Sequence, residues 1–335
     1  MTGQPGPAFE PTPPGARILL AGATGYIGKV LARELVARGF RVVCLLREGA
    51  ALRNAELLAS ETHIVNVCDS AAMSTLNLGN EPVAAAVSCL ASRSGGVEDA
   101  WAVDHRANSN VMKLARNYGA QSFVLLSAIC VQKPKLSFQH AKLAFEQELI
   151  QSGLAYSIVR PTAFFKSLAG QVAGVAAGKP FTVFGDGNLT ACKPISENDL
   201  ARFMADCLTE SSRHNAILPV GGPGEALTPR QQGELLFRLC GRTPRFRQVP
   251  LSVFDVAIPV LAGLSRLVPP LGDKAEFARI GRYYASESML LLNPVTGKYD
   301  ADATPSWGTD TLEDFYRRVL AEGMAGQELG PHKLF

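Results

Sequence analysis

Gly22-Ala-Thr-Gly25-Tyr-Ile-Gly28 decides the fold, because its three glycines stand between a strand pattern and a helix pattern. The apolar run at 17–22 predicts a buried strand, and residues 26–38 carry apolar side chains at helical spacing. In this context glycines let the backbone approach a pyrophosphate, and the helix N-terminus offers the phosphate free N–H groups. The sequence therefore predicts a dinucleotide site formed by Gly22, Thr24, Gly25, Tyr26, Ile27 and Gly28.

Strands and helices alternate in the chain that follows this loop. Apolar runs predict further strands at 41–46, 62–65, 83–90, 121–127 and 156–159, and helical periodicity predicts helices at 97–118 and 137–151. Buried strands separated by helices favour a parallel sheet with both faces covered. We expect an α/β, doubly wound, Rossmann-like domain over residues 16–160. A proline-rich, disordered tail is predicted at residues 1–15.

The pattern loosens after residue 160, which predicts a smaller, mainly substrate-binding C-terminal part over residues 161–335 that packs on the sheet. Helices are expected at 163–178, 196–209 and 228–240, and a short strand is expected at 181–184. Residues 251–268 are very apolar. This stretch can cover a substrate slot, form a dimer face, rest on a membrane surface or pack in the core.

The composition argues against several classes of protein. The chain has 335 residues with 33 Lys and Arg against 30 Asp and Glu, a near balance that speaks against nucleic-acid binding. Seven cysteines without a C-x-x-C pair predict small buried side chains in a reducing compartment, and no metal site. Neither a signal peptide nor an apolar run of about 20 residues is visible. We therefore expect a cytoplasmic protein, peripheral to a membrane at most.

The end of the second predicted strand indicates which cofactor binds. An NAD site places an acid there for the ribose 2′-hydroxyl, whereas this chain has Leu45-Leu46-Arg47-Glu48. The Arg47 guanidinium suits a 2′-phosphate, which predicts NADPH; the alternative is that Glu48 binds the ribose and Arg47 is a surface residue. Arg93, in the loop after the fourth strand, is expected at the cofactor edge of the sheet, where it can contact cofactor or substrate.

The glycine loop resembles the short-chain dehydrogenase/reductase superfamily, and the wider pattern resembles its atypical, NmrA-like branch. The superfamily has a Ser or Thr at the end of strand five and Tyr-x-x-x-Lys on the next helix; here these positions hold Ser127, Phe138 and Lys142. The resemblance implies that Ser127 and Lys142 are catalytic, that Lys142 holds the nicotinamide ribose, and that Pro161 lies against the nicotinamide. Phe138 cannot be the acid that the superfamily's Tyr provides, which disfavours ordinary alcohol dehydrogenation.

Segments of the second half resemble the NADPH-type 8-vinyl reductases of photosynthetic organisms. They include Tyr156-Ser-Ile-Val-Arg-Pro-Thr-Ala-Phe-Phe-Lys-Ser167, Ala191-Cys-Lys-Pro-Ile-Ser196 and Gly281-Arg-Tyr-Tyr-Ala285. The resemblance implies NADPH-dependent reduction of the 8-vinyl group of divinyl chlorophyllide or protochlorophyllide to ethyl, in chlorophyll or bacteriochlorophyll biosynthesis. The partner is then a magnesium tetrapyrrole. Contact with a photosynthetic membrane is a hypothesis, and the oligomeric state is left open.

This reaction needs a hydride at the terminal vinyl carbon and a proton at the adjacent carbon, so orientation against the nicotinamide is a large part of the rate. The candidate proton donors are Lys142, which we place first, His140, Tyr156 and water. A flat, apolar substrate predicts an apolar slot with a cation for its propionate. We expect substrate contacts from Phe138, Phe164, Phe165, Lys166, Phe184, Lys193 and Tyr283.

Two other functions stay open on the sequence alone. The first is another atypical reductase, acting on an alkene, an enone or a quinone, which predicts turnover of a small activated alkene. The second is a non-catalytic NADP-binding regulator, which the loss of tyrosine at Phe138 favours. A regulator predicts cofactor binding without hydride transfer.

Overall fold

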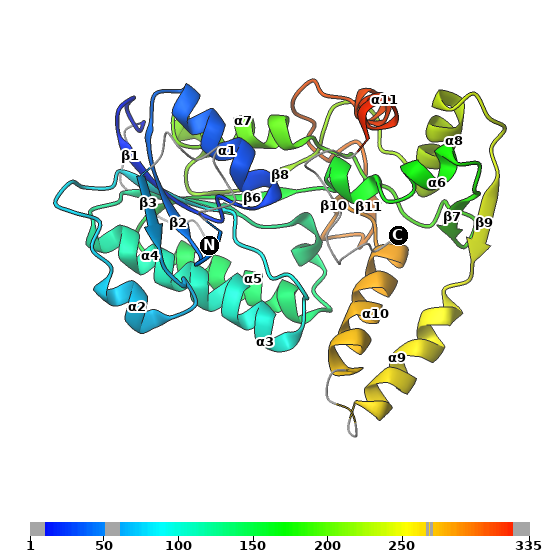
Figure 1. Ribbon diagram of the computed structural model, residues 1–335, viewed down its shortest axis with the longest axis horizontal. Helices are drawn as coiled ribbons and strands as arrows, with labels where there is room; N and C mark the ends of the chain where they lie inside the picture. The colour runs from blue at the N-terminus through cyan, green and yellow to red at the C-terminus, as the bar shows by residue number, and fades with distance from the viewer. Residues whose placement is uncertain (1–10, 51–60, 266–267, 269–270, 324–335) are drawn as a thin grey trace.

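The computed structural model describes residues 11–50, 61–265, 268 and 271–323, and its centre is a seven-stranded parallel sheet (Figure 1). The strands lie in the order β3-β2-β1-β4-β5-β6-β8, a doubly wound arrangement whose strand order reverses between β1 and β4. Ligands of such sheets bind outside the carboxyl ends of the strands. The bounds are β1 Arg17–Ala21, β2 Arg41–Leu46, β3 Glu61–Ile64, β4 Ala85–Ser88, β5 Ser122–Leu126, β6 Ala155–Pro161 and β8 Ala216–Val220.

Alternate residues of the strands point into two separate cores. Ile18 and Leu20 of β1 belong to the core beneath α1 (Tyr26–Ala37) and α7 (Glu197–Asp206). Leu19 and Ala21 belong to the opposite core, beneath α2 (Ser70–Thr75), α4 (Asn108–Asn117) and α5 (Ser137–Ile150). This period-two alternation is that of strands buried on both faces, and it confirms the predicted fold class.

The long helix predicted at 97–118 is interrupted. α3 (Val97–Ala100) and α4 flank π-helical turns at Trp101–Ala107. Widened turns change the direction in which the following side chains point, and they are frequent at functional sites. The π-helical turns carry Asp104, whose side chain is almost completely buried.

The predicted strands of the first half are present, but the sheet does not end at the predicted boundary of residue 160. β8, which the sequence did not predict, pairs with β6 from Ser157 and Ala216 to Pro161 and Val220. α7 packs beside α1 on the same face. Proline is depleted in strands and tolerated at their edges, so Pro219 masked the strand pattern of β8. The sheet domain therefore includes β8 and α7, from the part expected to bind substrate.

Two further expectations differ from the structure. Residues 1–10 of the predicted disordered tail lie outside the described residues, but Thr12 is buried and its N–H donates to the Leu208 carbonyl at 2.8 Å. The helix predicted at 163–178 is instead a 3-10 turn at Phe165–Leu168 followed by the short α6 (Val172–Ala176). Gly170 and Gly174 lower the helix propensity of this segment.

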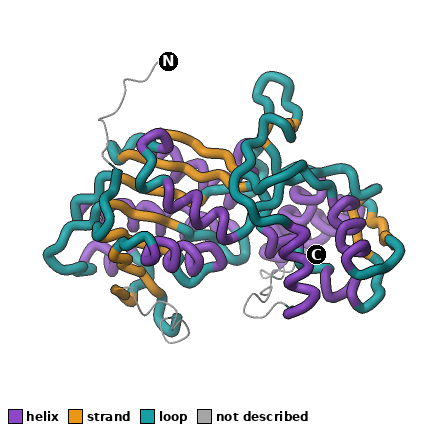
Figure 2. Tube along the Cα trace, turned by 90° about the horizontal axis from the view of Figure 1, so that it is seen from above, coloured by secondary structure: helices purple, strands orange, loops and turns teal. Residues whose placement is uncertain are grey.

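The remaining elements form a smaller lobe beside the sheet (Figures 1 and 2). α9 and α10 make a helical hairpin that projects from this lobe (Figure 1). Within the described ranges we find no helix with the length and apolar character needed to cross a bilayer. The bounds are β7 Phe181–Phe184, α8 Pro229–Leu239, β9 Phe246–Val249, α9 Ser252–Leu264, α10 Leu271–Ser286, β10 Leu291–Leu292, β11 Tyr299–Asp300 and α11 Leu312–Glu322.

One segment of the lobe begins after β6, and backbone hydrogen bonds join its two ends. The N–H of Phe165 donates to the Ile195 carbonyl at 3.2 Å, and the N–H of Ile195 donates to the Ala163 carbonyl at 2.9 Å. Phe164 and Ile195 therefore face each other as a parallel bridge. The chain between them forms α6, β7 and a turn, and α7 begins shortly after Ile195.

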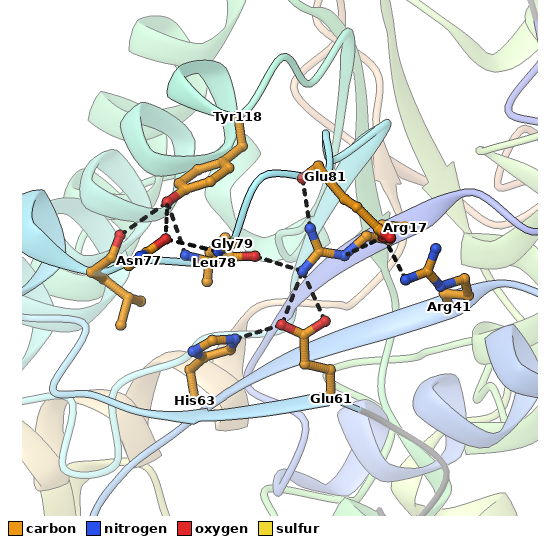
Figure 3. Close-up of polar contacts among 10 residues, drawn as sticks. Arg17, Arg41, Glu61, His63, Asn77, Leu78, Gly79, Glu81 and Tyr118 are labelled. Carbon is orange, nitrogen blue, oxygen red and sulfur yellow. Dashed lines mark hydrogen bonds and ion pairs between the residues drawn. The ribbon is translucent and has the colours of Figure 1, made fainter.

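A buried arginine organises the edge of the sheet opposite the strands' carboxyl ends (Figure 3). Nη2 of Arg17 donates to both carboxylate oxygens of Glu61 at 2.9 and 2.8 Å and to the Leu78 carbonyl at 2.9 Å, and Nη1 donates to the Glu81 carbonyl at 2.6 Å. Partial burial opposes ionisation of Glu61, but its contacts with His63 and Arg17 outweigh this and lower the pKa of Glu61. This network ties β1 to β3 and to the loop before β4.

Candidate functional site

The glycine loop leaves no room for side chains where it turns. A Cβ on Gly28 would lie 2.0 Å from the Gly22 carbonyl oxygen, and a Cβ on Gly22, whose φ is +83°, would lie 2.8 Å from the Cys89 backbone. Gly25 is the N-cap of α1, no described side chain caps that end, and the first turn carries no acid. The open N–H groups and the positive end of the helix dipole suit a phosphate. The residues present therefore fit a dinucleotide's pyrophosphate.

Lys166 lies beside this loop and is not part of the cavity wall described below. Its Nζ stands 5.1 Å from the centroid of the Tyr26 ring. Burial and the charge of Lys29 lower the pKa of Lys166, and Glu197 opposes them. The Tyr26 hydroxyl in turn donates to Glu197 at 2.5 Å. Lys29 and Lys166 near an open helix N-terminus favour an anion. The predicted substrate contact of Lys166 stays a prediction.

Arg47 and Glu48 both follow β2, and both are exposed. The structure brings Arg47 to the end of the strand beside β1, where the glycine loop begins. Among the described residues, no hydrogen bond or ion pair holds the Arg47 guanidinium or the Glu48 carboxylate away from a ribose. The position fits the predicted contact with a 2′-phosphate.

A cavity of about 450 Å³ lies at the carboxyl ends of β4, β5 and β6, with α10 on its far side. Most of its wall is apolar, and the volume falls within the range of small-molecule sites. Pro161 at the end of β6 is part of this wall. The aromatic residues on the wall are Phe138, Phe164, Phe181, Phe184, Phe277 and Tyr284.

Lys142 is a buried cation of this wall, and its partner is Asp104 from the π-helical turns. Nζ lies 2.9 Å from Oδ1, with the two side chains 8% and 1% exposed. Oδ1 also accepts the Ser92 N–H at 3.4 Å, whereas the buried Oδ2 has no hydrogen-bond partner within the described part of the chain. Burial raises the pKa of the Cys89 thiol to about 12, and the charge of Lys142 opposes the rise. The Cys89 backbone is the group that packs on Gly22.

Sequence reasoning missed Asp104, although its position carried a signal. Ala100, Asp104, Ala107 and Val111 follow one another at helical spacing, and all four are buried. An acid on the apolar face of a helix needs a buried partner, because an unpaired buried carboxylate is strongly destabilising. The π-helical turns determine which cation pairs with Asp104, and the sequence did not predict these turns.

Ser127 also lines the cavity, at the end of β5, but its hydroxyl is engaged elsewhere. It donates to Oε1 of Glu146 at 2.5 Å. Glu146 in turn accepts two hydrogen bonds from the Arg160 guanidinium, one of them from Nε at 3.2 Å. The structure therefore brings Ser127 and Lys142 to one cavity without bonding them to a common partner.

Three of the predicted substrate contacts, Phe138, Phe164 and Phe184, line the cavity. Phe165 does not, because its ring packs in the core of the smaller lobe with its centroid 5.4 Å from that of Phe315. Of the predicted rings after β6, the structure thus brings Phe164 and Phe184 to the wall.

Lys193 and Tyr283 are held by backbone carbonyls away from the cavity wall. Lys193 Nζ donates to the Thr304 carbonyl at 3.0 Å and to Ser306 Oγ at 3.2 Å. The Tyr283 hydroxyl donates to the Cys130 carbonyl at 2.9 Å and to the Lys133 carbonyl at 3.1 Å. Both side chains stabilise the junction between the sheet and the C-terminal segment.

Tyr284, the neighbour of Tyr283, is the tyrosine that lines the cavity. Phe277, Ile280 and Tyr284 lie three and four residues apart on α10, so they share one face of the helix, and all three belong to the wall. Tyr283 falls outside this stripe. The spacing from Phe277 was the available signal that favoured Tyr284 over Tyr283.

Arg93 is exposed on the rim of the cavity, and its loop lies against α10. Its N–H donates to Asp99 at 2.8 Å. A Cβ on Gly95 would lie 2.5 Å from Ile280, and a Cβ on Gly96 would lie 2.8 Å from Asp273. The loop therefore joins the carboxyl end of β4 to the lobe that closes the cavity.

Comparison with known proteins gives one family profile and close relatives. Residues 22–211 match a family described as NAD(P)H-binding. The divinyl chlorophyllide a 8-vinyl-reductase, chloroplastic, of Cucumis sativus is 55% identical over 337 residues, which cover 96% of this chain and 80% of that protein. The protein of the same description from Zea mays is 54% identical over 342 residues, covering 98% and 84%.

A solved structure shares the fold at low identity. The NADPH-dependent quinone oxidoreductase QOR2 of Escherichia coli, complexed with NADPH, superposes with a TM-score of 0.66. It is 17% identical, and the match covers 90% of this chain and 99% of that one. At this identity the likeness concerns the fold alone.

Proposed function

The chain belongs to the divinyl chlorophyllide a 8-vinyl-reductase family, and on that premise we propose where and how its cavity performs the reaction. The protein is an NADPH-dependent oxidoreductase of chlorophyll biosynthesis that reduces the 8-vinyl group of divinyl chlorophyllide to ethyl. The observation that carries the assignment of the site is the position of Lys142. This buried cation lies on an aromatic cavity wall at the carboxyl ends of the strands, the same edge of the sheet at which the glycine loop follows β1. A role in bacteriochlorophyll biosynthesis stays a prediction.

The cavity wall orients a flat pigment. Phe138 and Phe164, at the sheet, and Phe184 and Phe277, in the smaller lobe, offer ring faces and edges to the macrocycle. NADPH, when bound, supplies the hydride that the terminal vinyl carbon receives. The wall residues hold the vinyl group at reacting distance and exclude water, which is a large part of the rate for a reaction without an oxyanion.

Lys142 and Asp104 act on this site as a pair. The Lys142 ammonium compensates the negative charge that spreads over the macrocycle after hydride arrival, because charges act strongly in a site from which water is excluded. Asp104 holds that ammonium in place, with Oδ1 2.9 Å from Nζ. We assign Asp104 as a positioning residue for Lys142, and Lys142 to the nicotinamide ribose and the reacting end of the pigment.

Arg93 is placed to bind the free carboxylate of the substrate. The described residues of the cavity wall include two with positive charge, Arg93 and Lys142, and Lys142 already faces Asp104. Arg93 stands on the rim, where a propionate would project into water. Replacement of Arg93 by glutamine should raise KM about 10-fold for the free acid and leave KM for the phytyl ester unchanged, because a charge-assisted hydrogen bond is lost only with the free acid.

The test of the function uses purified protein, NADPH and divinyl chlorophyllide under anaerobic conditions, with pigments separated by chromatography. We expect conversion to the monovinyl pigment, much slower with NADH. Divinyl protochlorophyllide run in parallel compares the two pigments. Tight NADPH binding without conversion of either pigment would contradict the proposal and indicate a regulator or a reductase of small alkenes, which turnover of enones and quinones would separate.

Contact with a membrane surface is proposed for α9. Its exposed face carries an apolar stripe at helical spacing, with Val253, Val256, Val260 and Leu264 exposed by 51, 66, 53 and 47%. Its inner face reaches the cavity wall, because Phe254 packs on Phe184 with ring centroids 5.1 Å apart. A helix with one apolar face in lipid and the other on the cavity would let an apolar pigment pass between them.

Flotation with phosphatidylcholine vesicles tests this contact. The protein should float with the vesicles, and the Val256→Asp variant should remain at the bottom of the gradient. Val295→Asp is the matched control, because Val295 is 91% exposed in the turn between β10 and β11. The contact is rejected if the unaltered protein does not float, or if Val256→Asp floats as well as the control.

A further inference from the structure

Reduction of a vinyl group needs a proton as well as a hydride. Several protic side chains near the cavity already have hydrogen-bond or ion-pair partners. Ser127 donates to Glu146, and Lys142 is paired with Asp104. The Lys142 ammonium is the charge that compensates the buried Asp104 carboxylate. These bonds argue for a different donor.

The other side chains that the sequence offered as donors lie elsewhere. His140 is exposed on the outer side of α5, while Lys142, two residues on, is buried. Tyr156 is on β6 and packs against the core beneath α4 and α5. Neither belongs to the cavity wall.

Tyr284 differs from all of these in position and in bonding. It reaches the wall from α10, opposite the strand ends, and within the described part of the chain its hydroxyl makes one long contact, 3.9 Å to the Cys130 sulfur. Such a contact is weak, so the hydroxyl can turn to a bound pigment. Its ring packs on the same apolar cluster as Phe138, the residue at the position where the short-chain reductases have tyrosine.

We propose that the Tyr284 hydroxyl donates the proton that completes the reduction, so that a tyrosine from α10 supplies the phenol that Phe138 lacks. This assignment rests on the proposed function and adds a catalytic residue to it. The smaller lobe then contributes chemistry to the reaction as well as the shape of the pocket.

The step balances in atoms and charge. The terminal vinyl carbon gains a hydride, and the electron pair of the double bond moves to the adjacent carbon and the macrocycle. That carbon takes the Tyr284 proton, a C–H bond forms as the O–H bond breaks, and the vinyl group has become ethyl. The phenolate recovers its proton from water when the product leaves.

The surroundings keep the phenol protonated before the step. Burial raises the pKa of Tyr284 well above its ordinary value, and its contact with Cys130 and the charge of Asp104 add to the rise. Tyr284, Lys142 and Asp104 all line the same cavity. A phenolate formed there is compensated by the Lys142 ammonium.

The experiment compares the unaltered protein with Tyr284→Phe and with Tyr118→Phe. Both variants lose one hydroxyl, and Tyr118 lies at the opposite edge of the sheet (Figure 3). For Tyr284→Phe we expect kcat to fall about 100-fold or more, the usual contribution of a general acid. The NADPH Kd and pigment KM should stay within about twofold, because ring packing is kept. Tyr118→Phe should keep its kcat.

The solvent deuterium isotope effect on kcat separates a chemical role from a structural one. It should increase in Tyr284→Phe, because proton transfer becomes slower relative to the other steps. A kcat within about threefold of the unaltered protein would overturn the assignment, since general acids contribute far more. A lower kcat with an unchanged isotope effect or with weakened binding would overturn it too. Failure of the unaltered protein to form any monovinyl pigment would instead contradict the proposed function.

Discussion

The Lys142 ammonium and the Asp104 carboxylate face each other across 2.9 Å, although they come from different helices, α5 and the π-helical turns before α4. Both side chains are nearly shielded from water. A buried pair of this kind is more important for specificity than for net stability, because each charge is tolerated only while the other is present. The pair therefore fixes a charged group where the reaction needs it.

Asp104→Asn should destabilise the protein by about 3 kcal/mol and lower kcat/KM for divinyl chlorophyllide, because it leaves the buried Lys142 ammonium unpaired. The double variant with Lys142→Met should recover part of the stability but none of the activity. Urea unfolding of both variants, together with steady-state kinetics, checks this. Additive losses in the double variant would show that the two side chains are not coupled.

Arg47→Gln should weaken NADPH binding by roughly 10- to 100-fold and leave NADH binding unchanged, because only NADPH carries the 2′-phosphate and a charged hydrogen bond is worth about 1.5–3 kcal/mol. Isothermal titration with both cofactors measures this. Glu48→Gln is the matched control and should leave the preference for NADPH intact. A loss of NADH affinity in Glu48→Gln would point to the alternative in which Glu48 binds the ribose.

Gly28→Ala should abolish measurable NADPH binding, because a Cβ at this position would lie 2.0 Å from the Gly22 carbonyl oxygen and would force the loop out of shape. Gly174→Ala is the control, since its Cβ would meet its nearest neighbour, the Lys179 side chain, at 3.9 Å. Fluorescence titration with NADPH measures both variants. Normal affinity in Gly28→Ala would mean that the cofactor does not use this loop.

Glu61→Gln should lower the free energy of unfolding by roughly 1 kcal/mol at pH 7, less than a shielded charged hydrogen bond contributes, because the Glu61 side chain is 40% exposed. The pKa of Glu61 is lowered in the folded protein. Its contribution is therefore present above the carboxyl's ordinary pKa and lost as the pH falls through the folded value. Urea unfolding at pH 7 and near pH 3 should show the difference between the two proteins shrinking. A difference that grows on acidification would contradict this role.

The positions of the residues expected to bind the cofactor could be predicted from the sequence because their signals are local. Once the sheet is known to be parallel, the positions of the glycine loop, the strand before it and the residue after β2 follow from the topology. The position of Lys142 could be predicted in the same way from the helix that carries it. Each of these residues depends on elements that are close to it in the chain.

The substrate half could not be predicted to the same degree, because its side chains come from distant elements. Lys193 has the charge expected of a carboxylate ligand, but the segment at Thr304 takes its ammonium. Tyr283 and Tyr284 are chemically identical neighbours, and the spacing from Phe277 favours Tyr284 only once α10 is known to face the cavity. Asp104 contacts Lys142 because of the π-helical turns, which residue propensities do not predict. The direction of a side chain across such contacts is a tertiary property.

The bridge between Phe164 and Ile195 also bears on how such proteins diverge. The chain between these two residues starts and finishes at one fixed point, so insertions or deletions within it do not shift the strands that carry the cofactor. Loop closure depends weakly on length, by about 0.6 kcal/mol for each doubling, so large changes there are energetically tolerable. Natural or engineered changes in this segment can therefore alter this wall of the pocket to suit another substrate. The strands and the glycine loop keep their positions.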